Sequence, residues 1–252
     1  MGAKKNHQAD FISGIYNYCD RWCERCPLTH RCLLFYQESQ RRMRHYEEDE
    51  YPDDMDIVLK DVQENLQGTV RMVKQAAEER GVDLEELVRE EEKEETDFRR
   101  PAIANHPLRQ KGHKFAMDSH HFLENLSTLL HEEQRKAISV DQLDDLQDCF
   151  EVLSWYHMQI AVKIDRALSG KSRSAKLQEE FGAGFLNDSD GSAKVAYLGI
   201  IHCVEALTKV YEWNQPFHNE ITPLLQILYE LVEGVDEQFP GHKTFKRPGF
   251  DG

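Results

Sequence analysis

Apolar residues along this chain recur at spacings of three and four, and the alternating pattern of β-strands is scarcely seen. The pattern predicts an all-α fold, with a helical bundle in the C-terminal half. Four long helices are expected there, at residues 113–136, 141–169, 192–213 and 219–236. The Ser- and Gly-rich stretch at 169–192 is expected to form a long loop between the second and third of these helices.

The N-terminal half also has a helical pattern. From Asp54 to Gly81 one apolar stripe is predicted, formed by Val58, Val62, Leu66, Val70, Val73 and Ala77. Gly81 is a plausible C-terminal stop for this helix. Asp83 is a candidate N-cap for a second, strongly charged helix.

Charge and helix-breaking residues divide the chain. Residues 1–45 carry 8 Lys and Arg against 4 Asp and Glu, whereas residues 46–97 carry 6 against 20. Pro and Gly residues then mark a linker. We therefore expect a cysteine cluster module at 1–46, an acidic helical arm at 47–98, a linker at 99–112, a helical bundle at 113–238 and a flexible tail at 239–252.

The net charge of −15 disfavours binding to nucleic acid or anionic membranes, which repel an acidic protein. The expected partner is a redox protein or another protein, although the sequence identifies neither it nor the oligomeric state. The acidic arm could dock a basic partner or only provide solubility. No apolar run approaches the roughly 20 residues that span a bilayer, and the N-terminus lacks the apolar stretch of a secretory signal. A cytoplasmic location is expected.

Four cysteines within fourteen residues are the most specific feature of the chain: Cys19, Cys23, Cys26 and Cys32, spaced C-x3-C-x2-C-x5-C. In a reducing compartment, cysteines grouped in this way more often hold metal than form disulfides. Structural zinc usually takes its ligands from two short knuckles separated by a longer loop, but here the middle gap is only two residues. A [4Fe–4S] cluster is larger, and one winding loop can supply its four thiolates. The spacing therefore favours the cluster over zinc.

The segment from Cys23 to Cys32, CERCPLTHRC, resembles the iron–sulfur loop of the endonuclease III and adenine DNA glycosylase family, whose pattern is C-x6-C-x2-C-x5-C. The last three cysteines match, while Cys19 lies three residues nearer to Cys23 than that family's first cysteine does. The resemblance implies a [4Fe–4S] cluster. It does not imply DNA repair, because no helix–hairpin–helix glycine motif is found and the acidic charge is unsuitable for a glycosylase.

Cys19, Cys23 and Cys26 also resemble the three-cysteine signature of radical S-adenosylmethionine enzymes. Arg25 departs from that pattern at a position that is usually aromatic, and Cys32 is available to ligate the fourth iron. The helical pattern also provides no β/α barrel to surround such a site. With four protein ligands the cluster has no open position for a substrate, so electron transfer or redox and iron sensing is the expected function. The alternative is a zinc-stabilised helical adaptor that binds a protein partner.

A third hypothesis is a metalloenzyme with a second metal in the bundle. His157 lies among apolar positions of its predicted helix, and a buried histidine requires a partner. That partner could be a main-chain carbonyl or Tyr hydroxyl, which makes the residue structural, or a metal. Cys203 is interpreted as a small core residue. No Ser-His-Asp or Cys-His constellation can be placed, so the sequence assigns no catalytic residue.

Overall fold

The computed structural model describes residues 11–81, 83–85, 89, 103–133, 140–181, 188–213 and 218–251. Six α-helices and no β-strand occur in this part of the chain, which confirms the predicted all-α fold. The chain forms two compact units. The first consists of residues 1–16 and 23–100, and the second of residues 17–22 and 101–252. Each unit is described by itself.

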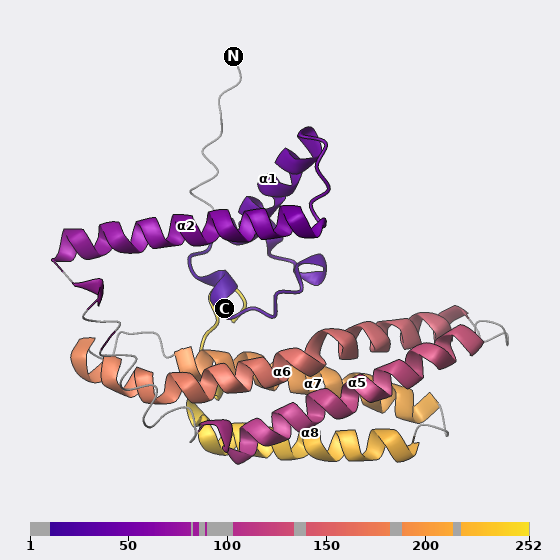
Figure 1. The fold of residues 1–252 in the computed structure, drawn as a ribbon. Coiled ribbons are helices and arrows are strands. Elements are labelled where there is room, and N and C mark those ends of the chain that lie inside the picture. Colours follow the sequence, from indigo (N-terminus) through magenta and orange to yellow (C-terminus); the bar gives the residue numbers. More distant parts are fainter. Residues whose placement is uncertain are drawn as a thin grey trace. The chain divides into compact units, whose positions relative to one another are not determined.

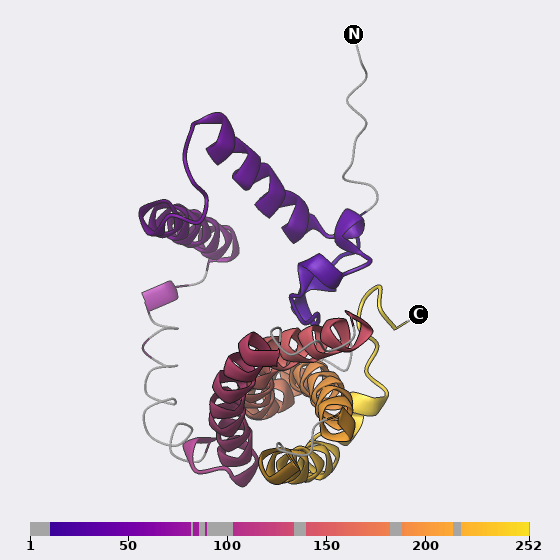
Figure 2. The same cartoon turned by 90° about the vertical axis from the view of Figure 1, so that its right-hand side faces the viewer.

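Four helices of the second unit form the predicted bundle (Figures 1 and 2). They are α5 (Pro107–Glu133), α6 (Val140–Phe181), α7 (Asp188–Trp213) and α8 (His218–Gln238). Consecutive helices are neighbours and α8 returns to α5, so the four surround one core. The largest side chains buried there are Phe115, Leu126, Leu153, Ile160, Ile164, Ile200, Leu207, Ile221, Leu228 and Leu231. Burial of this apolar surface is the main force that holds the bundle together.

The bundle helices are longer than the sequence pattern predicts. Helix α5 begins at Pro107, inside the expected linker, and Leu108 is buried against the core. Proline suits the first helical position because its fixed φ matches the helix and no partner for an N–H is needed there. Helices α6 and α7 extend into the expected Ser- and Gly-rich loop, and residues 182–187 lie outside the described part.

The C-terminal segment makes defined contacts with the bundle, unlike the expected flexible tail. Phe239 and His242 are each 2% exposed. The ring of His242 hydrogen-bonds through Nε2 to Asp236 Oδ1 at 2.7 Å, and Lys194 Nζ pairs with Asp251 Oδ2 at 3.0 Å. The sequence did not indicate these contacts because they depend on single polar pairs rather than on a periodic apolar pattern.

The first unit contains α1 (Leu33–Glu47) and α2 (Met55–Arg80). The predicted ends of α2 are confirmed: the side chain of Asp54 accepts a hydrogen bond from the Asp56 N–H at 2.9 Å, and Gly81 has a φ of 67°. Five members of its apolar stripe are between 38% and 62% exposed: Val58, Val62, Leu66, Val70 and Val73. Asp83 accepts from the Glu85 N–H as an N-cap would, while most of the following charged helix lies outside the described residues.

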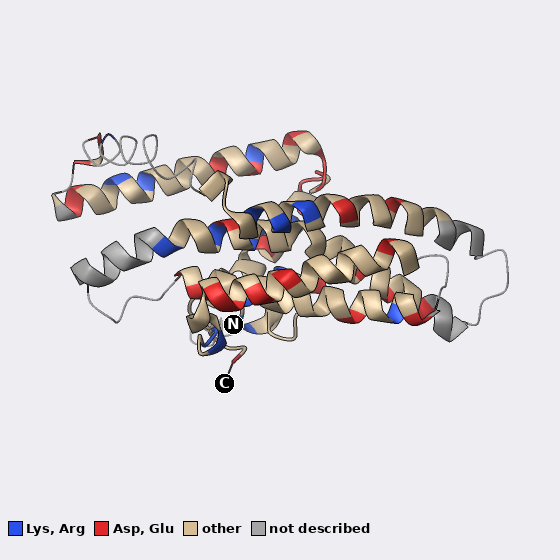
Figure 3. Cartoon of the chain, turned by 90° about the horizontal axis from the view of Figure 1, so that it is seen from below, with Lys and Arg blue, Asp and Glu red and all other residues tan. Residues whose placement is uncertain are grey.

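The acidity of the expected arm is concentrated outside α2. Residues 46–54 contain six Asp and Glu and no Lys or Arg, whereas α2 contains four basic and five acidic residues. Figure 3 shows the two signs interspersed along the helices. The strongest negative charge in the described part of the arm therefore lies at the turn between α1 and α2.

Candidate metal centre

Three of the four clustered cysteines belong to the first unit, where short turns set the course of the chain. A 3-10 turn spans Cys23–Arg25 and another spans Thr29–Arg31. The Cys26 N–H donates to the Cys23 carbonyl at 3.2 Å, and the Cys32 N–H donates to the Thr29 carbonyl at 3.1 Å.

Cys32 is the N-cap residue of α1. It has an extended backbone, and its carbonyl accepts from the Tyr36 N–H at 3.1 Å, the first bond of the helix. The first bond of α1 therefore fixes the backbone of Cys32, the last of the four clustered cysteines.

Cys19 belongs to the second unit, and its main chain is bonded to α6. Lys163 Nζ donates to the Cys19 carbonyl at 3.4 Å. Burial raises the pKa of the Cys19 thiol, while a backbone hydrogen bond and the positive charge of Arg21 lower it. Burial also disfavours the charged form of Lys163 and therefore lowers its pKa. A bound metal would supply the positive charge that a buried Cys19 thiolate requires.

Asp20 fastens the same segment to two consecutive turns of α6. Its carbonyl accepts from Trp155 Nε1 at 3.0 Å and from Gln159 Nε2 at 2.5 Å. Its carboxylate accepts from the Tyr156 hydroxyl at 2.5 Å and from the Trp22 N–H at 3.1 Å. These bonds fix the backbone directly after Cys19.

Trp22 adds an aromatic contact to this anchor. Its ring stacks on Trp155 with centroids 5.3 Å apart and meets Tyr156 edge-on at 5.8 Å. Offset and edge-on aromatic pairs of this kind contribute roughly 0.5–1.5 kcal/mol beyond the area they bury. Trp22 is therefore an element of packing within the second unit.

The cysteines of the first unit are not gathered at the spacing of zinc ligands. Within the described residues, a group of three ligand atoms that all lie within 4.8 Å of one another is formed by His45, Glu48 and Glu50, and none is formed by Cys23, Cys26 and Cys32. Tetrahedral zinc would hold its sulfurs about 3.8 Å apart, given Zn–S bonds of about 2.3 Å. A four-iron cluster holds its thiolates farther apart than zinc does.

His157 is buried in the bundle, as predicted, with main-chain carbonyls as partners. Its Nδ1 lies 2.9 Å from the Leu153 carbonyl and 3.0 Å from that of Ser154, so Nδ1–H donates. Burial lowers its pKa. Its ring stacks on His120 at 6.1 Å between centroids, and Nε2 has no hydrogen-bond partner among the described residues. These contacts support the structural interpretation, and the second metal site remains a prediction.

Sequence analysis did not single out His45, which the structure places among carboxylates at the end of α1. The local signal was present, because the segment HYEEDE follows one histidine with four acidic residues. The decisive partner, Asp61, lies 16 residues away on α2 and could not be identified from that segment.

No family model, curated protein or solved structure matches this chain. The expectation of a cluster therefore rests on the chain's own cysteines and on their resemblance to the glycosylase loop. Among the described residues, no helix combines the length and the apolar composition needed to cross a bilayer.

Proposed function

We propose that this chain is an iron–sulfur protein that binds a [4Fe–4S] cluster through Cys19, Cys23, Cys26 and Cys32. The observation that carries the proposal is the C-x3-C-x2-C-x5-C spacing. The two 3-10 turns and the fixed backbone at Cys32 support it, because they present partly exposed thiols along one short winding segment. Zinc is the competing ligand.

The function proposed for the cluster is electron transfer or redox and iron sensing. Four thiolate ligands leave no iron open to a substrate, so the cluster would exchange electrons or change its own state rather than activate a bound molecule. The anchor at Asp20 bears on sensing in particular. Since the residue after Cys19 is bonded to α6, a change in ligation at Cys19 would act on a helix of the bundle core.

The test is the metal and sulfide content of protein purified without oxygen from iron-replete cells. We expect about four iron and four acid-labile sulfide per chain, a brown colour that bleaches on reduction by dithionite, and an electron paramagnetic resonance signal of the reduced cluster. Replacing each clustered cysteine by serine should remove most of the iron. Cys203→Ala is the matched control, because Cys203 is fully buried in the bundle and should not affect iron content.

Two results would overturn the proposal. One is a colourless protein with one zinc per chain, which would eliminate the cluster and leave the zinc-stabilised helical adaptor as the alternative. The other is unchanged iron and sulfide in the serine variants. The two functions are separated by oxidising the loaded protein: electron transfer requires a cluster that survives repeated cycles, whereas sensing requires a cluster that is lost or converted.

A further inference from the structure

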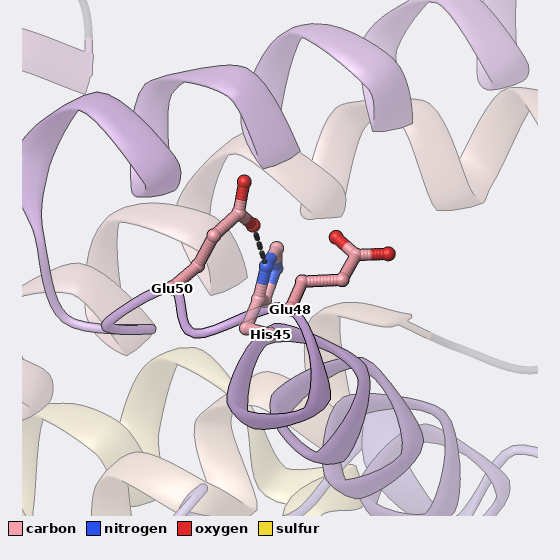
Figure 4. A group of neighbouring side chains, drawn as sticks. All are labelled: His45, Glu48 and Glu50. Atoms are coloured by element: carbon pink, nitrogen blue, oxygen red, sulfur yellow. Dashed lines mark hydrogen bonds and ion pairs between the residues drawn. The ribbon is translucent and has the colours of Figure 1, made fainter.

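The turn between α1 and α2 brings a buried histidine against acidic side chains. His45 lies in the last turn of α1 and is 2% exposed. Asp49 adopts a left-handed backbone with a φ of 56°, and the Glu50 N–H donates to the His45 carbonyl at 2.8 Å. The chain thereby turns back, and the Glu50 carboxylate points at the imidazole ring, with Glu48 nearby (Figure 4).

Both ring nitrogens of His45 face a carboxylate. Nδ1 lies 2.6 Å from Glu50 Oε2, and Nε2 lies 3.1 and 3.2 Å from the two oxygens of Asp61 on α2. A neutral imidazole has one N–H only. One nitrogen would then direct its lone pair at a carboxylate oxygen, which is repulsive. The geometry therefore requires a positively charged species on this ring, either a second proton or a metal ion.

Neighbouring basic side chains only partly offset the negative charge. Lys60 Nζ lies 3.4 Å from Glu50 Oε1, and Arg41 Nε lies 3.8 Å from Asp61 Oδ2. Arg44 is farther, at 4.0 Å from Asp61 Oδ1. Lys60 approaches the Glu50 oxygen that does not face Nδ1, whereas Arg41 and Arg44 approach the same Asp61 oxygens that face Nε2. None of these three side chains is paired with Glu50 Oε2, the oxygen that faces Nδ1, so a proton or a metal ion would occupy the position between them.

Asp61 is placed as a positioning residue. Histidines that bind a metal usually donate the second ring N–H to a carboxylate or carbonyl, which fixes the tautomer and the direction of the ring. Here Asp61, with a side chain 14% exposed, accepts from Nε2. The lone pair of Nδ1 is then directed toward Glu50, and one ligand atom each of His45, Glu48 and Glu50 lie within 4.8 Å of one another.

We propose that His45 Nδ1, Glu48 and Glu50 bind one divalent first-row metal ion, with water at the remaining positions. One imidazole nitrogen and two carboxylates suit manganese, iron or zinc. Two neighbouring ligand atoms, each about 2.1 Å from an ion, lie about 3 Å apart, so Glu50 must move outward by a few tenths of an ångström. Its side chain is 25% exposed. This site is distinct from the cysteines.

The probe is Mn²⁺, because its preference for oxygen and nitrogen donors over thiolates keeps it away from the cysteines. Full-length protein is titrated at neutral pH, and free Mn²⁺ is measured by its electron paramagnetic resonance signal. We expect one bound ion per chain. His45→Gln and Glu50→Gln should weaken binding at least about tenfold, and Asp61→Asn by about 10- to 100-fold through the lost orientation of the ring.

Matched controls make the result decisive. Glu47→Gln changes an exposed carboxylate of α1 outside the group and should leave the affinity unchanged. Cys23→Ser should also leave it unchanged, so failure of the iron–sulfur proposal does not affect this test. If His45→Gln disturbs the hairpin by circular dichroism, Glu48→Gln tests the site through an exposed ligand. Three results would each overturn the proposal. The first is no bound Mn²⁺ at millimolar concentration, and the second is wild-type affinity for Mn²⁺ in both Glu50→Gln and Glu48→Gln. The third is loss of Mn²⁺ binding in Cys23→Ser.

Discussion

Two of the buried histidines, His45 in the first unit and His157 in the second, lie in opposite electrostatic surroundings. The hydrogen bond that the His45 ring donates to Glu50 is the main cause that raises the pKa of His45, and Asp61 acts in the same direction against the effect of burial. Burial lowers the pKa of His157, which has carbonyl partners and the ring of His120 beside it. The same residue type therefore stabilises one unit when charged and the other when neutral.

The two histidines should give opposite pH dependences of the free energy of unfolding. Below its unfolded pKa of about 6.5, His157 is protonated more readily in the unfolded chain, so stability falls as the pH drops through its lowered folded pKa. The contribution of His45 is complete below about pH 6.5 and is lost as the pH rises through its raised folded pKa. The measurement is urea unfolding at a series of pH values with a chelator present. His157→Gln should reduce the loss of unfolding free energy at acidic pH, and His45→Gln should reduce the loss at alkaline pH.

The control for this pair is His121→Gln, since His121 lies on α5 with a side chain that is 72% exposed. This variant should show the same loss of unfolding free energy as the wild type at both acidic and alkaline pH. A His157→Gln protein that loses as much stability on acidification as the wild type would contradict the assignment of that histidine as a buried neutral group.

At the scale of elements, helix type could be predicted from apolar spacing, and helix ends only where a capping residue marks them. Asp54 and Gly81 bound α2 because each satisfies or permits a local backbone arrangement. The extension of α6 to Phe181 was missed because the Ser and Gly residues of this stretch were interpreted as a loop, although each lowers helix propensity without excluding a helix. In the bundle, Gly170 lies in ordinary contact distance of Ser189 on α7.

The candidate sites show the same limit. The cysteine spacing is local and could be read directly, whereas the anchor between Asp20 and Trp155 joins residues 135 positions apart. Likewise His45 meets Asp61 only because the α1–α2 turn folds the chain back on itself. Sequence patterns identify ligand types at short range, but they do not identify the partners that orient those ligands from another element.

Gly68 provides a test of whether the face of α2 that carries it is free of packing contacts. A methyl group there would meet nothing within 4 Å, and glycine is less favourable than alanine in a helix interior by about 1 kcal/mol. Gly68→Ala should therefore raise the helicity and thermal midpoint of the first unit, measured by circular dichroism. Gly81→Ala should do the opposite by roughly 1 kcal/mol, because the φ of 67° disfavours a Cβ atom. A lower midpoint for Gly68→Ala would show that α2 is packed at that face.

At the scale of the whole molecule, the segment that carries Cys19 is part of the core packing of the second unit. Tyr18 is 4% exposed and meets the ring of Phe245 edge-on at 4.8 Å between centroids. It lies against Gly191 in the first turn of α7, where a side chain would occupy the space of both rings. The proposed cluster ligand is therefore attached to the bundle through Tyr18 on one side and through Asp20 on the other.

Gly191→Ala should weaken the packing of this segment against the bundle without substituting any cysteine. The added Cβ would lie 2.8 Å from Phe245 and closer still to the ring of Tyr18, so both rings must move. Overpacking of this kind costs about 1–3 kcal/mol in the free energy of unfolding. If Cys19 ligates the cluster, iron should also be lost faster in air than from the wild type. Gly170→Ala is the control, because its Cβ would make ordinary contacts of 3.4 Å and longer. A destabilised Gly191→Ala protein that keeps its iron as long as the wild type would mean that the bundle and the cluster site are independent, and the sensing function would then lose its route into α6.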